Sequence, residues 1–167
     1  MAKPFPANIT RFDPYKSFRF IVYFGDTKVA GVSKVTGLKR SSDPIDYKEG
    51  GNAIILKGLG RTKYEPITLE RGLTQSTEFR DWADAAQKLD NGAPIQSLKN
   101  LRKDIRIVLL NEAGQEVMGF KVHRCWVSEY QALPDLDAGG NSVAIEHIKL
   151  ENEGWEPDTS VKEKAEV

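Results

Sequence analysis

The sequence predicts a mainly β fold, a sandwich or barrel of short antiparallel strands with one α-helix packed against it. Most of the apolar segments alternate with a period of two residues, which is typical of strands that bury one face. One segment, from Phe79 to Leu89, has the helical period instead. Clusters of glycine, proline, asparagine and aspartate separate these segments and predict turns between them.

The whole-chain composition favours a single domain. The chain has 167 residues, and we expect residues 1–154 to form one β-barrel domain with an N-terminal arm and residues 155–167 to form a charged, flexible tail. Its 24 basic and 24 acidic residues cancel, so no overall basic field attracts nucleic acid or a membrane. No apolar run approaches the about 20 residues of a membrane span. We therefore expect a protein made in the cytoplasm that does not insert into membranes.

The first predicted strand is Phe18 to Phe24, an aromatic-rich run in which Phe18 and Phe20 share a face with Val22 and Phe24. Gly25-Asp26 then turns the chain into a second run, Lys28 to Thr36. The two runs predict an opening hairpin.

A polar segment, Gly37 to Gly51, follows, and it is too rich in turn residues and charges to belong to a core. It is either a long exposed loop or an extended hairpin. Two short strands are expected next, at Ala53–Lys57 and Pro66–Arg71.

The sequence GLGRTKYE between those two strands raises the question of a phosphate-binding loop. Such a loop needs GxxxxGK[ST] running directly into a helix, because backbone amides and the helix dipole hold the anion together. Here Arg61-Thr62 follows Gly60, and the next element is a strand. The segment is better explained as a tight turn that carries solvated cations.

The helix is expected from about Ser76 to Asp90, with Ser76 as its N-cap and Asn91-Gly92 followed by Pro94 at its end. One apolar stripe would pack against the sheet, and it consists of Phe79, Trp82, Ala83, Ala86 and Leu89.

The C-terminal half returns to strands. Ile105, Ile107 and Leu109 alternate with polar residues, and after a turn Met118, Phe120 and Val122 do the same, which predicts a second long hairpin. The same alternation places Trp126 in the core. A turn-rich loop, ALPDLDAGGNS, precedes a last strand from Val143 to Leu150.

No complete catalytic or metal-binding motif is present. His123 and Cys125 would share a strand face and could be joined by His147, but structural zinc sites usually need four ligands. There is no GxSxG or HExxH sequence. We therefore expect no enzyme, no catalytic or metal site and no cofactor, and a small buried thiol at Cys125.

The three tryptophans allow a different function. Trp82, Trp126 and Trp155 could stack against bases in a monomeric, nucleic-acid-binding β-barrel. Core packing explains Trp82 and Trp126 as well, and only Trp155 has no explanation in the local periodicity.

Six segments, in order along nearly the whole chain, follow the pattern of one known family. They are DPYKSFRFIVYF at 13–24, AGVSKVTGL at 30–38, YKEGGN at 47–52, GLGRTKYEPITLERGLT at 58–74, IRIVLLNEAGQEV at 105–117 and VAIEHIKLENEGW at 143–155. The KYxxxTLxRG element followed by a helix with a tryptophan is the most specific of them. In these segments the chain resembles the tail tube protein family of contractile phage tails and bacterial contractile injection systems. The family often has a proline where this chain has Val127, and residues 92–101 are longer than expected.

The resemblance implies a ring-forming tail-tube fold, with hexameric rings stacked into a conduit for DNA or protein cargo. The implied partners are further copies of the chain, sheath subunits, the baseplate or spike hub, and a tape-measure protein or other cargo in the lumen of a phage tail or injection-system particle. A tube-initiating paralogue at the baseplate is the alternative within the family.

The resemblance also implies that function lies in surfaces between subunits. In the family a projecting loop at residues 37–51 contacts the adjacent ring, and Lys63 and Arg71 become candidates for charged contacts between neighbours. The full set of expected interface residues is Lys39, Arg40, Asp43, Asp46, Tyr47, Lys48, Glu49, Lys63, Tyr64 and Arg71. Pairing of the runs 28–36 and 53–57 across subunits would also remove exposed strand edges.

Overall fold

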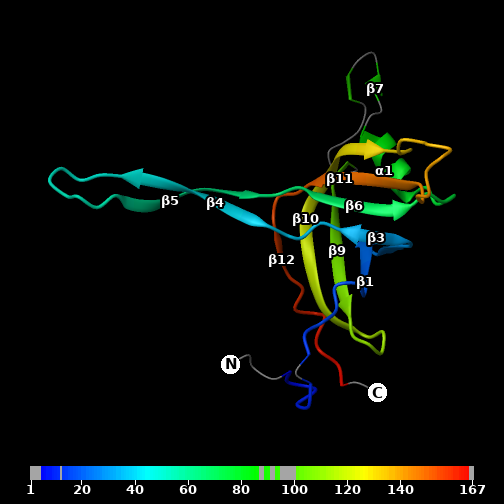
Figure 1. The fold of residues 1–167 in the computed structure, drawn as a ribbon, viewed down its shortest axis with the longest axis horizontal. Coiled ribbons are helices and arrows are strands. Elements are labelled where there is room, and N and C mark those ends of the chain that lie inside the picture. Colours follow the sequence, from blue (N-terminus) through cyan, green and yellow to red (C-terminus); the bar gives the residue numbers. More distant parts are fainter. Residues whose placement is uncertain (1–4, 12, 87–88, 91–92, 95–100, 166–167) are drawn as a thin grey trace.

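A computed structural model describes residues 5–11, 13–86, 89–90, 93–94 and 101–165 of the chain (Figure 1). Within these residues the protein is mainly β, with one short helix, α1, so the mainly β prediction is confirmed. The elements are β1 (Phe20–Phe24), β2 (Thr27–Val29), β3 (Val32–Val35), β4 (Arg40–Tyr47), β5 (Leu56–Tyr64), β6 (Ile67–Gly72), α1 (Glu78–Ala86), β7 (Leu89–Asp90), β8 (Ala93–Pro94), β9 (Lys103–Leu110), β10 (Glu116–Gln131), β11 (Ile145–Glu151) and β12 (Trp155–Pro157).

The body of the protein is one antiparallel sheet that bends over a single core. In the described residues its strand order is β2-β1-β9-β10-β11-β6-β3, with β12 pairing the first half of β10. The 16-residue β10 runs through both halves of the sheet. Val22 and Ile107 from one half therefore meet Leu69 and Ile148 from the other in one buried cluster. The strands β2 and β3 lie at the two ends of this order.

The predicted opening hairpin is confirmed, but its second run is two strands. β1 pairs β2 through a turn at Gly25, whereas β3 pairs β6 at the far end of the sheet. Gly31, between β2 and β3, has a φ of 77°, a conformation that glycine adopts without steric cost and that changes the chain direction. Phe18 lies before the strand and is exposed, contrary to the expectation that it packs with Phe20.

A bulge in β10 reverses the alternation that the sequence suggests. The pairing with β9 shifts between Val122 and Cys125, and Arg124 has a φ of 50°. The extra residue turns Cys125 and Val127 into the core and leaves Trp126 37% exposed. The predictions that Trp126 lies in the core and that His123 shares a face with Cys125 are therefore wrong.

Helix α1 is shorter than expected. It runs from Glu78 to Ala86, and Thr77, not Ser76, is its N-cap, because the Thr77 carbonyl accepts the first helical hydrogen bond from the Asp81 amide at 2.8 Å. Leu89 lies in β7, which pairs with β8, so it does not extend the helical stripe. Residues 87–88 and 91–92 lie outside the described residues.

The rest of the stripe anchors the helix as predicted. Phe79, Trp82 and Ala83 are buried, and the Phe24 ring lies against Trp82 with ring centroids 4.8 Å apart. The Trp82 indole also donates a hydrogen bond of 2.9 Å to the carbonyl oxygen of Leu101.

The final segment packs on the body for several residues beyond 154. Trp155–Pro157 form β12 on β10, and the Asp158 side chain is buried on the outer face of the sheet beside Gly119. Asp158 accepts a hydrogen bond from the Ser160 hydroxyl, and it lies 3.8 Å from the Lys121 ammonium. The flexible tail therefore does not begin at residue 155 as expected, because an edge of β10 and a buried carboxylate fix residues 155–158.

Residues 40–64 project from the body (Figure 1). The strands β4 and β5 pair only with each other and form a long two-stranded ribbon that projects to the left in Figure 1. The extended-hairpin alternative for residues 37–51 is thus confirmed. The strand expected at Ala53–Lys57 lies instead at Leu56–Tyr64, so GLGRTKY is strand and not the tight turn that the sequence suggested.

Candidate assembly surface

The ribbon formed by β4 and β5 is exposed over its whole length. None of the residues from 30 to 66, all of which the structure describes, is buried. At about 3.3 Å per residue, the nine-residue β5 extends for roughly 30 Å. A two-stranded hairpin of this kind is marginally stable in water unless it packs on something else. The ribbon is therefore the part of the chain that most requires an external partner.

The register of the ribbon gives its outer half one apolar face. Ile45 pairs with Gly58 and Tyr47 pairs with Leu56, and paired residues point to the same side of a sheet. Ile45 is 55% exposed and Tyr47 is 52% exposed. We call Ile45, Tyr47, Leu56 and Gly58 the ribbon face. The opposite side of the same half carries Pro44 with Leu59 and Asp46 with Lys57.

Gly60 sets the bend between the two halves of the ribbon. The pairing shifts between Ser42 and Pro44, and a Cβ atom on Gly60 would lie 2.3 Å from the Asp43 carbonyl oxygen. No side chain fits there without moving the backbone of β4. At Gly58 the corresponding distance, to the Ile45 carbonyl oxygen, is 3.6 Å, which is an ordinary contact.

The base of the ribbon is fixed to the body by aromatic contacts. The Trp155 ring lies 6.3 Å from the Tyr64 ring, centroid to centroid, and the Arg40 guanidinium lies 5.8 Å from the Trp155 centroid. Trp155 thus contacts both strands of the ribbon. Nearby, the Asn152 amide donates a 3.0 Å hydrogen bond to the Glu65 carbonyl oxygen. These contacts set the direction in which the ribbon leaves the body.

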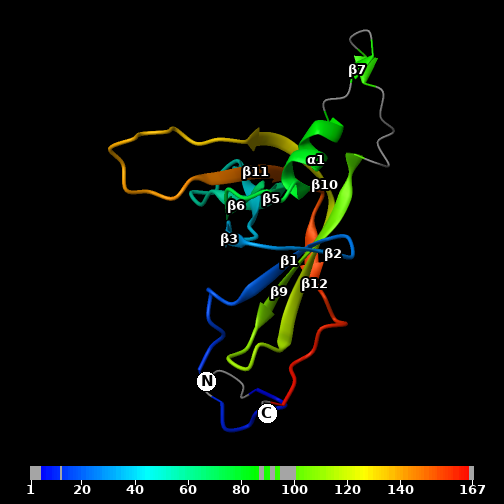
Figure 2. The same cartoon turned by 90° about the vertical axis from the view of Figure 1, so that its right-hand side faces the viewer.

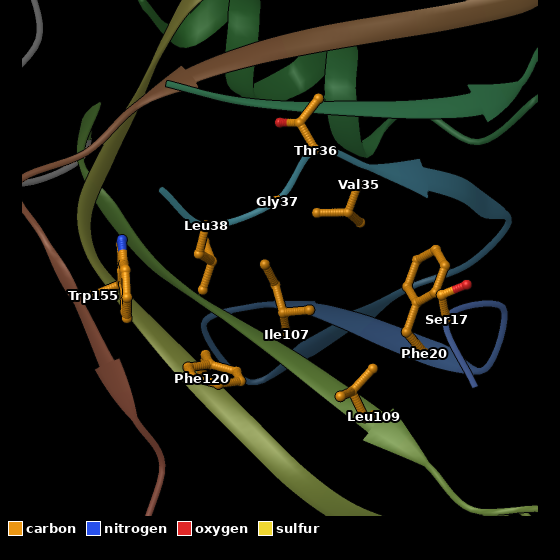
Figure 3. Close-up of a pocket in the computed structure, with 10 residues that line it drawn as sticks. All are labelled: Ser17, Phe20, Val35, Thr36, Gly37, Leu38, Ile107, Leu109, Phe120 and Trp155. Carbon is orange, nitrogen blue, oxygen red and sulfur yellow. The ribbon is translucent and has the colours of Figure 1, made fainter. Parts of the chain in front are cut away.

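Trp155 also borders an apolar pocket of about 390 Å³ beneath the ribbon base (Figure 3). Figure 3 shows Leu38, Ile107 and Phe120 around its centre. None of the described residues that line the pocket is charged. The complete lining consists of Ser17, Phe20, Val35, Thr36, Gly37, Leu38, Ile107, Leu109, Phe120 and Trp155.

The Thr36 hydroxyl and the Trp155 indole, both in the lining, differ in whether they have a hydrogen-bond partner. The Thr36 hydroxyl accepts a hydrogen bond from the Thr68 amide at 2.8 Å. The indole nitrogen of Trp155 is buried and has no hydrogen-bond partner among the described residues. An unpaired buried donor is unfavourable and is normally matched by an acceptor.

The structure places most of the expected interface residues on the ribbon. The exposed ones are Lys39, Arg40, Asp43, Asp46, Tyr47, Lys48, Glu49 and Lys63, whereas Tyr64 is half-buried at the ribbon base. Whether they contact a neighbour stays a prediction.

Arg71 is the exception, since its side chain is only 1% exposed. Its guanidinium bonds to Glu146 at 2.5 Å and to Glu78 at 2.9 Å, and it donates to the Ser76 carbonyl oxygen. Arg71 therefore joins β6, β11 and the start of α1 inside one subunit. The prediction that Arg71 makes a charged contact with a neighbouring subunit is therefore wrong, because its side chain is not exposed.

The charges of this cluster stabilise one another. Burial alone would lower the pKa of Arg71, but the hydrogen bonds to Glu146 and Glu78 outweigh it and raise that pKa. The pKa of Glu78 is lowered, first by a hydrogen bond from its own backbone amide and then by Arg71. Arg71 and Glu78 are thus both held in their charged forms.

The residues considered for chemistry do not come together. Cys125 is buried, and burial raises the pKa of its thiol to about 12. His123 lies 3.2 Å from Glu156, whereas His147 lies 3.0 Å from Glu129 on another strand. In the described parts of the chain, no three His, Cys, Asp or Glu side chains are placed to hold a metal ion. Over the same residues, no helix is long and apolar enough to cross a membrane.

Sequence reasoning missed the ribbon face and the pocket. The sequence shows large apolar residues among charged ones at Ile45, Tyr47 and Leu56. That they share a face depends on the β4–β5 register. The pocket combines residues from both ends of the chain. A second exposed apolar group, on the 132–144 loop that extends from the body in Figure 2, was also missed, and it consists of Leu133, Leu136 and Val143.

Comparison with known families gives one match that covers most of the chain. The family model of the T4-like virus tail tube protein gp19 matches residues 16–156. No curated protein sequence matches the chain.

Solved structures agree with the family match. The chain is 28% identical to a chain of the sheath–tube complex of an extracellular contractile injection system, PVC, in its extended state. That match covers 93% of this chain and 99% of the other with a TM-score of 0.73. A chain of the anti-feeding prophage tube-terminating cap is also 28% identical, with 90% and 95% coverage and a TM-score of 0.75. Hcp1 from Flavobacterium johnsoniae, at 14% identity, 84% and 94% coverage and a TM-score of 0.50, shares the fold.

Proposed function

The chain belongs to the T4-like virus tail tube protein gp19 family, and on that premise we propose that it forms hexameric rings that stack into a tube within a contractile sheath. It is a structural subunit of a phage tail tube or contractile injection system, and its relatives in fold are structural tube proteins. The 28% identical chain belongs to a sheath–tube complex, which supports a sheath as the outer partner.

The observation that carries the proposal is the unsupported ribbon. A body with its own core would not need the β4–β5 ribbon held out in solvent with an apolar face. In a stack of rings, that ribbon reaches the next subunit and its apolar face becomes covered. Lys39, Arg40, Asp43, Asp46, Lys48, Glu49 and Lys63 then supply mixed charges that can pair between identical subunits without net repulsion.

The edges of the body sheet support ring closure. β2 and β3 lie at the two ends of the strand order, so each presents backbone groups on one side that no described strand pairs. Exposed edges favour pairing with another chain. Pairing around a ring satisfies these groups and leaves no free edge.

The tube is a conduit, and its wall is compatible with passing cargo. The chain has a net charge of zero, so the subunit as a whole has no strong overall attraction for nucleic acid or for acidic or basic proteins. DNA or protein cargo, with a tape-measure protein during assembly, occupies the lumen, and the baseplate or spike hub lies at one end of the tube. Function depends on surfaces between subunits and not on catalysis.

Negative-stain micrographs and sedimentation of the purified protein test this function directly. We expect rings of six subunits and stacked tubes. A protein that stays monomeric at all concentrations and retards oligonucleotides in a gel would contradict the proposal and favour a nucleic-acid-binding barrel.

A further inference from the structure

We propose that the apolar pocket at the ribbon base of one subunit receives the ribbon face of a second copy of the chain. The proposal rests on the tube function and adds to it the acceptor site and the side chains that fill it. The occupant is the face formed by Ile45, Tyr47, Leu56 and Gly58, and the acceptor is the pocket lined by Leu38, Phe120 and Trp155.

The two surfaces match in size and in lack of charge. An apolar cavity of roughly 150 Å³ is enough to hold a benzene molecule, and this pocket measures about 390 Å³. It therefore has room for more than one large side chain. Neither the described lining of the pocket nor the ribbon face carries a charged group, so burying one against the other leaves no unpaired charge.

The occupant comes from a second molecule because the ribbon cannot reach its own pocket. The pocket lies at the ribbon base, and the ribbon face lies on the outer half of a projection whose longer strand extends for roughly 30 Å. Folding back would break the β4–β5 pairing. The ribbon face and the pocket are thus different parts of the same chain. Contacts between two such parts give a head-to-tail arrangement of subunits, which closes into a ring or continues as a helix.

The 132–144 loop also exposes large apolar side chains, and it fits the pocket less well. Asp135 and Asp137 alternate with its large apolar residues Leu133 and Leu136. Inserting this loop would bring carboxylates toward an uncharged pocket, where no described lining residue can pair with them.

Trp155 connects the pocket to the base of the ribbon within each subunit. It borders the pocket, and it also contacts Tyr64 and Arg40 at the base of the same subunit's ribbon. Filling the pocket therefore packs the residue that sets the direction of the next ribbon. This arrangement favours growth of an assembly over isolated pairs.

Cross-linking between two variants, each with one introduced cysteine, tests the proposal. One preparation carries Leu38→Cys at the pocket and is ¹⁵N-labelled, and the other carries Tyr47→Cys on the ribbon face. The only native cysteine, Cys125, is buried with a raised thiol pKa and does not compete for the reagent. The two are mixed, assembled and treated with a short bismaleimide, and the linked peptides are identified by mass spectrometry.

Asp46→Cys is the matched control, because it is adjacent on the same strand and points to the opposite side. We expect labelled–unlabelled links between positions 38 and 47, and far fewer between 38 and 46. Ser17→Cys replaces Leu38→Cys as the acceptor variant if the latter does not fold, since Ser17 lines the same pocket and is exposed.

The possible outcomes separate this proposal from the tube function. Tubes without a link from the pocket to position 47, or with equal linking to position 46, overturn the pocket assignment and leave the tube function in place. Linking of the Leu38→Cys protein to a further variant, Leu136→Cys, without linking to position 47 would assign the pocket to the 132–144 loop. A chain that never assembles overturns both proposals.

Discussion

The body and the ribbon of this protein differ in burial: the body has a core, and the ribbon has none. The body brings β1, β9 and β10 together with β6, β11 and α1 around one buried cluster. The ribbon, from residue 40 to 64, contributes no buried residue, although the structure describes all of it. Both parts are antiparallel β-structure, so the secondary structure alone does not distinguish them.

The difference separates a part that stabilises the fold of one subunit from a part that contributes little to it. Hydrophobic burial contributes about 25 cal/mol per Å², and the ribbon gains little of it within one chain. Its apolar face can be covered only by another molecule. Matched substitutions in the two parts should therefore have unequal effects on the stability of a subunit.

The largest expected effect comes from the buried helix stripe. Trp82→Ala should lower the free energy of unfolding by about 3–5 kcal/mol, because it leaves a cavity beside Phe24 and removes a hydrogen bond to Leu101. Thermal and urea unfolding measure the change. Tyr47→Ala, which removes an aromatic ring from the ribbon, should shift the same curves by less than about 0.5 kcal/mol. Equal shifts in the two variants would contradict the distinction.

A smaller but still large effect is expected at the buried ion pairs. Arg71→Met should cost about 3 kcal/mol, because Glu146 stays buried and loses its charged partner. Lys63→Met, at an exposed cation of the ribbon, should change stability by less than about 0.5 kcal/mol. Chemical unfolding of both variants measures the change in the free energy of unfolding. An Arg71→Met protein as stable as the parent would show that the ion pairs of Arg71 do not stabilise the body.

These two residues also show what the sequence could and could not predict. Alternation predicted β1, β6, β9 and β11, because each strand buries one face and the pattern is local. Arg71 and Lys63 look alike in sequence, since a charged residue is usually exposed. Only the pairing of β6 with β11, which brings Arg71 to Glu146, buries one of them.

The remaining errors have local physical causes. The bulge at Arg124 inserts one residue into β10 and exposes Trp126, and nothing in the local alternation indicates an insertion. Gly58 and Gly60 suggested a turn, whereas at Gly60 the glycine is needed because the partner backbone passes too close for a Cβ atom. The ribbon face and the pocket depend on register and on contacts between distant segments. For that reason they could not be located from composition.

The acid sensitivity of the body is expected to depend on Glu78. Its pKa is lower in the folded protein than the about 4.3 of an unfolded chain. Its stabilising contribution is therefore present above that pH and is lost as the pH falls through the folded pKa. Glu78→Gln should lower stability at pH 7, and it should reduce the loss of stability between pH 5 and pH 3. Glu49→Gln on the ribbon is the control and should leave the pH profile unchanged.

A still smaller effect on subunit stability is expected at Gly60. Gly60→Ala forces the backbone of β4 away, because the new Cβ atom would lie 2.3 Å from the Asp43 carbonyl oxygen. The ribbon should bend differently and tubes should shorten or disappear in micrographs, while unfolding of the body changes by less than about 0.5 kcal/mol. Gly58→Ala, with 3.6 Å to its nearest neighbour, should still form tubes. Normal tubes from both variants would show that the ribbon geometry is unimportant.

Removal of the ribbon tests most directly whether it serves assembly and not folding. Residues 41–63 are replaced by a short Gly-Ser linker, with replacement of Ser41–Glu49 alone as the milder version. Circular dichroism and thermal unfolding report on the body, and electron microscopy with sedimentation reports on assembly. We expect a folded body that melts near the parent temperature and does not stack into tubes. Tubes of normal length, or a chain that no longer folds, would contradict the division between body and ribbon.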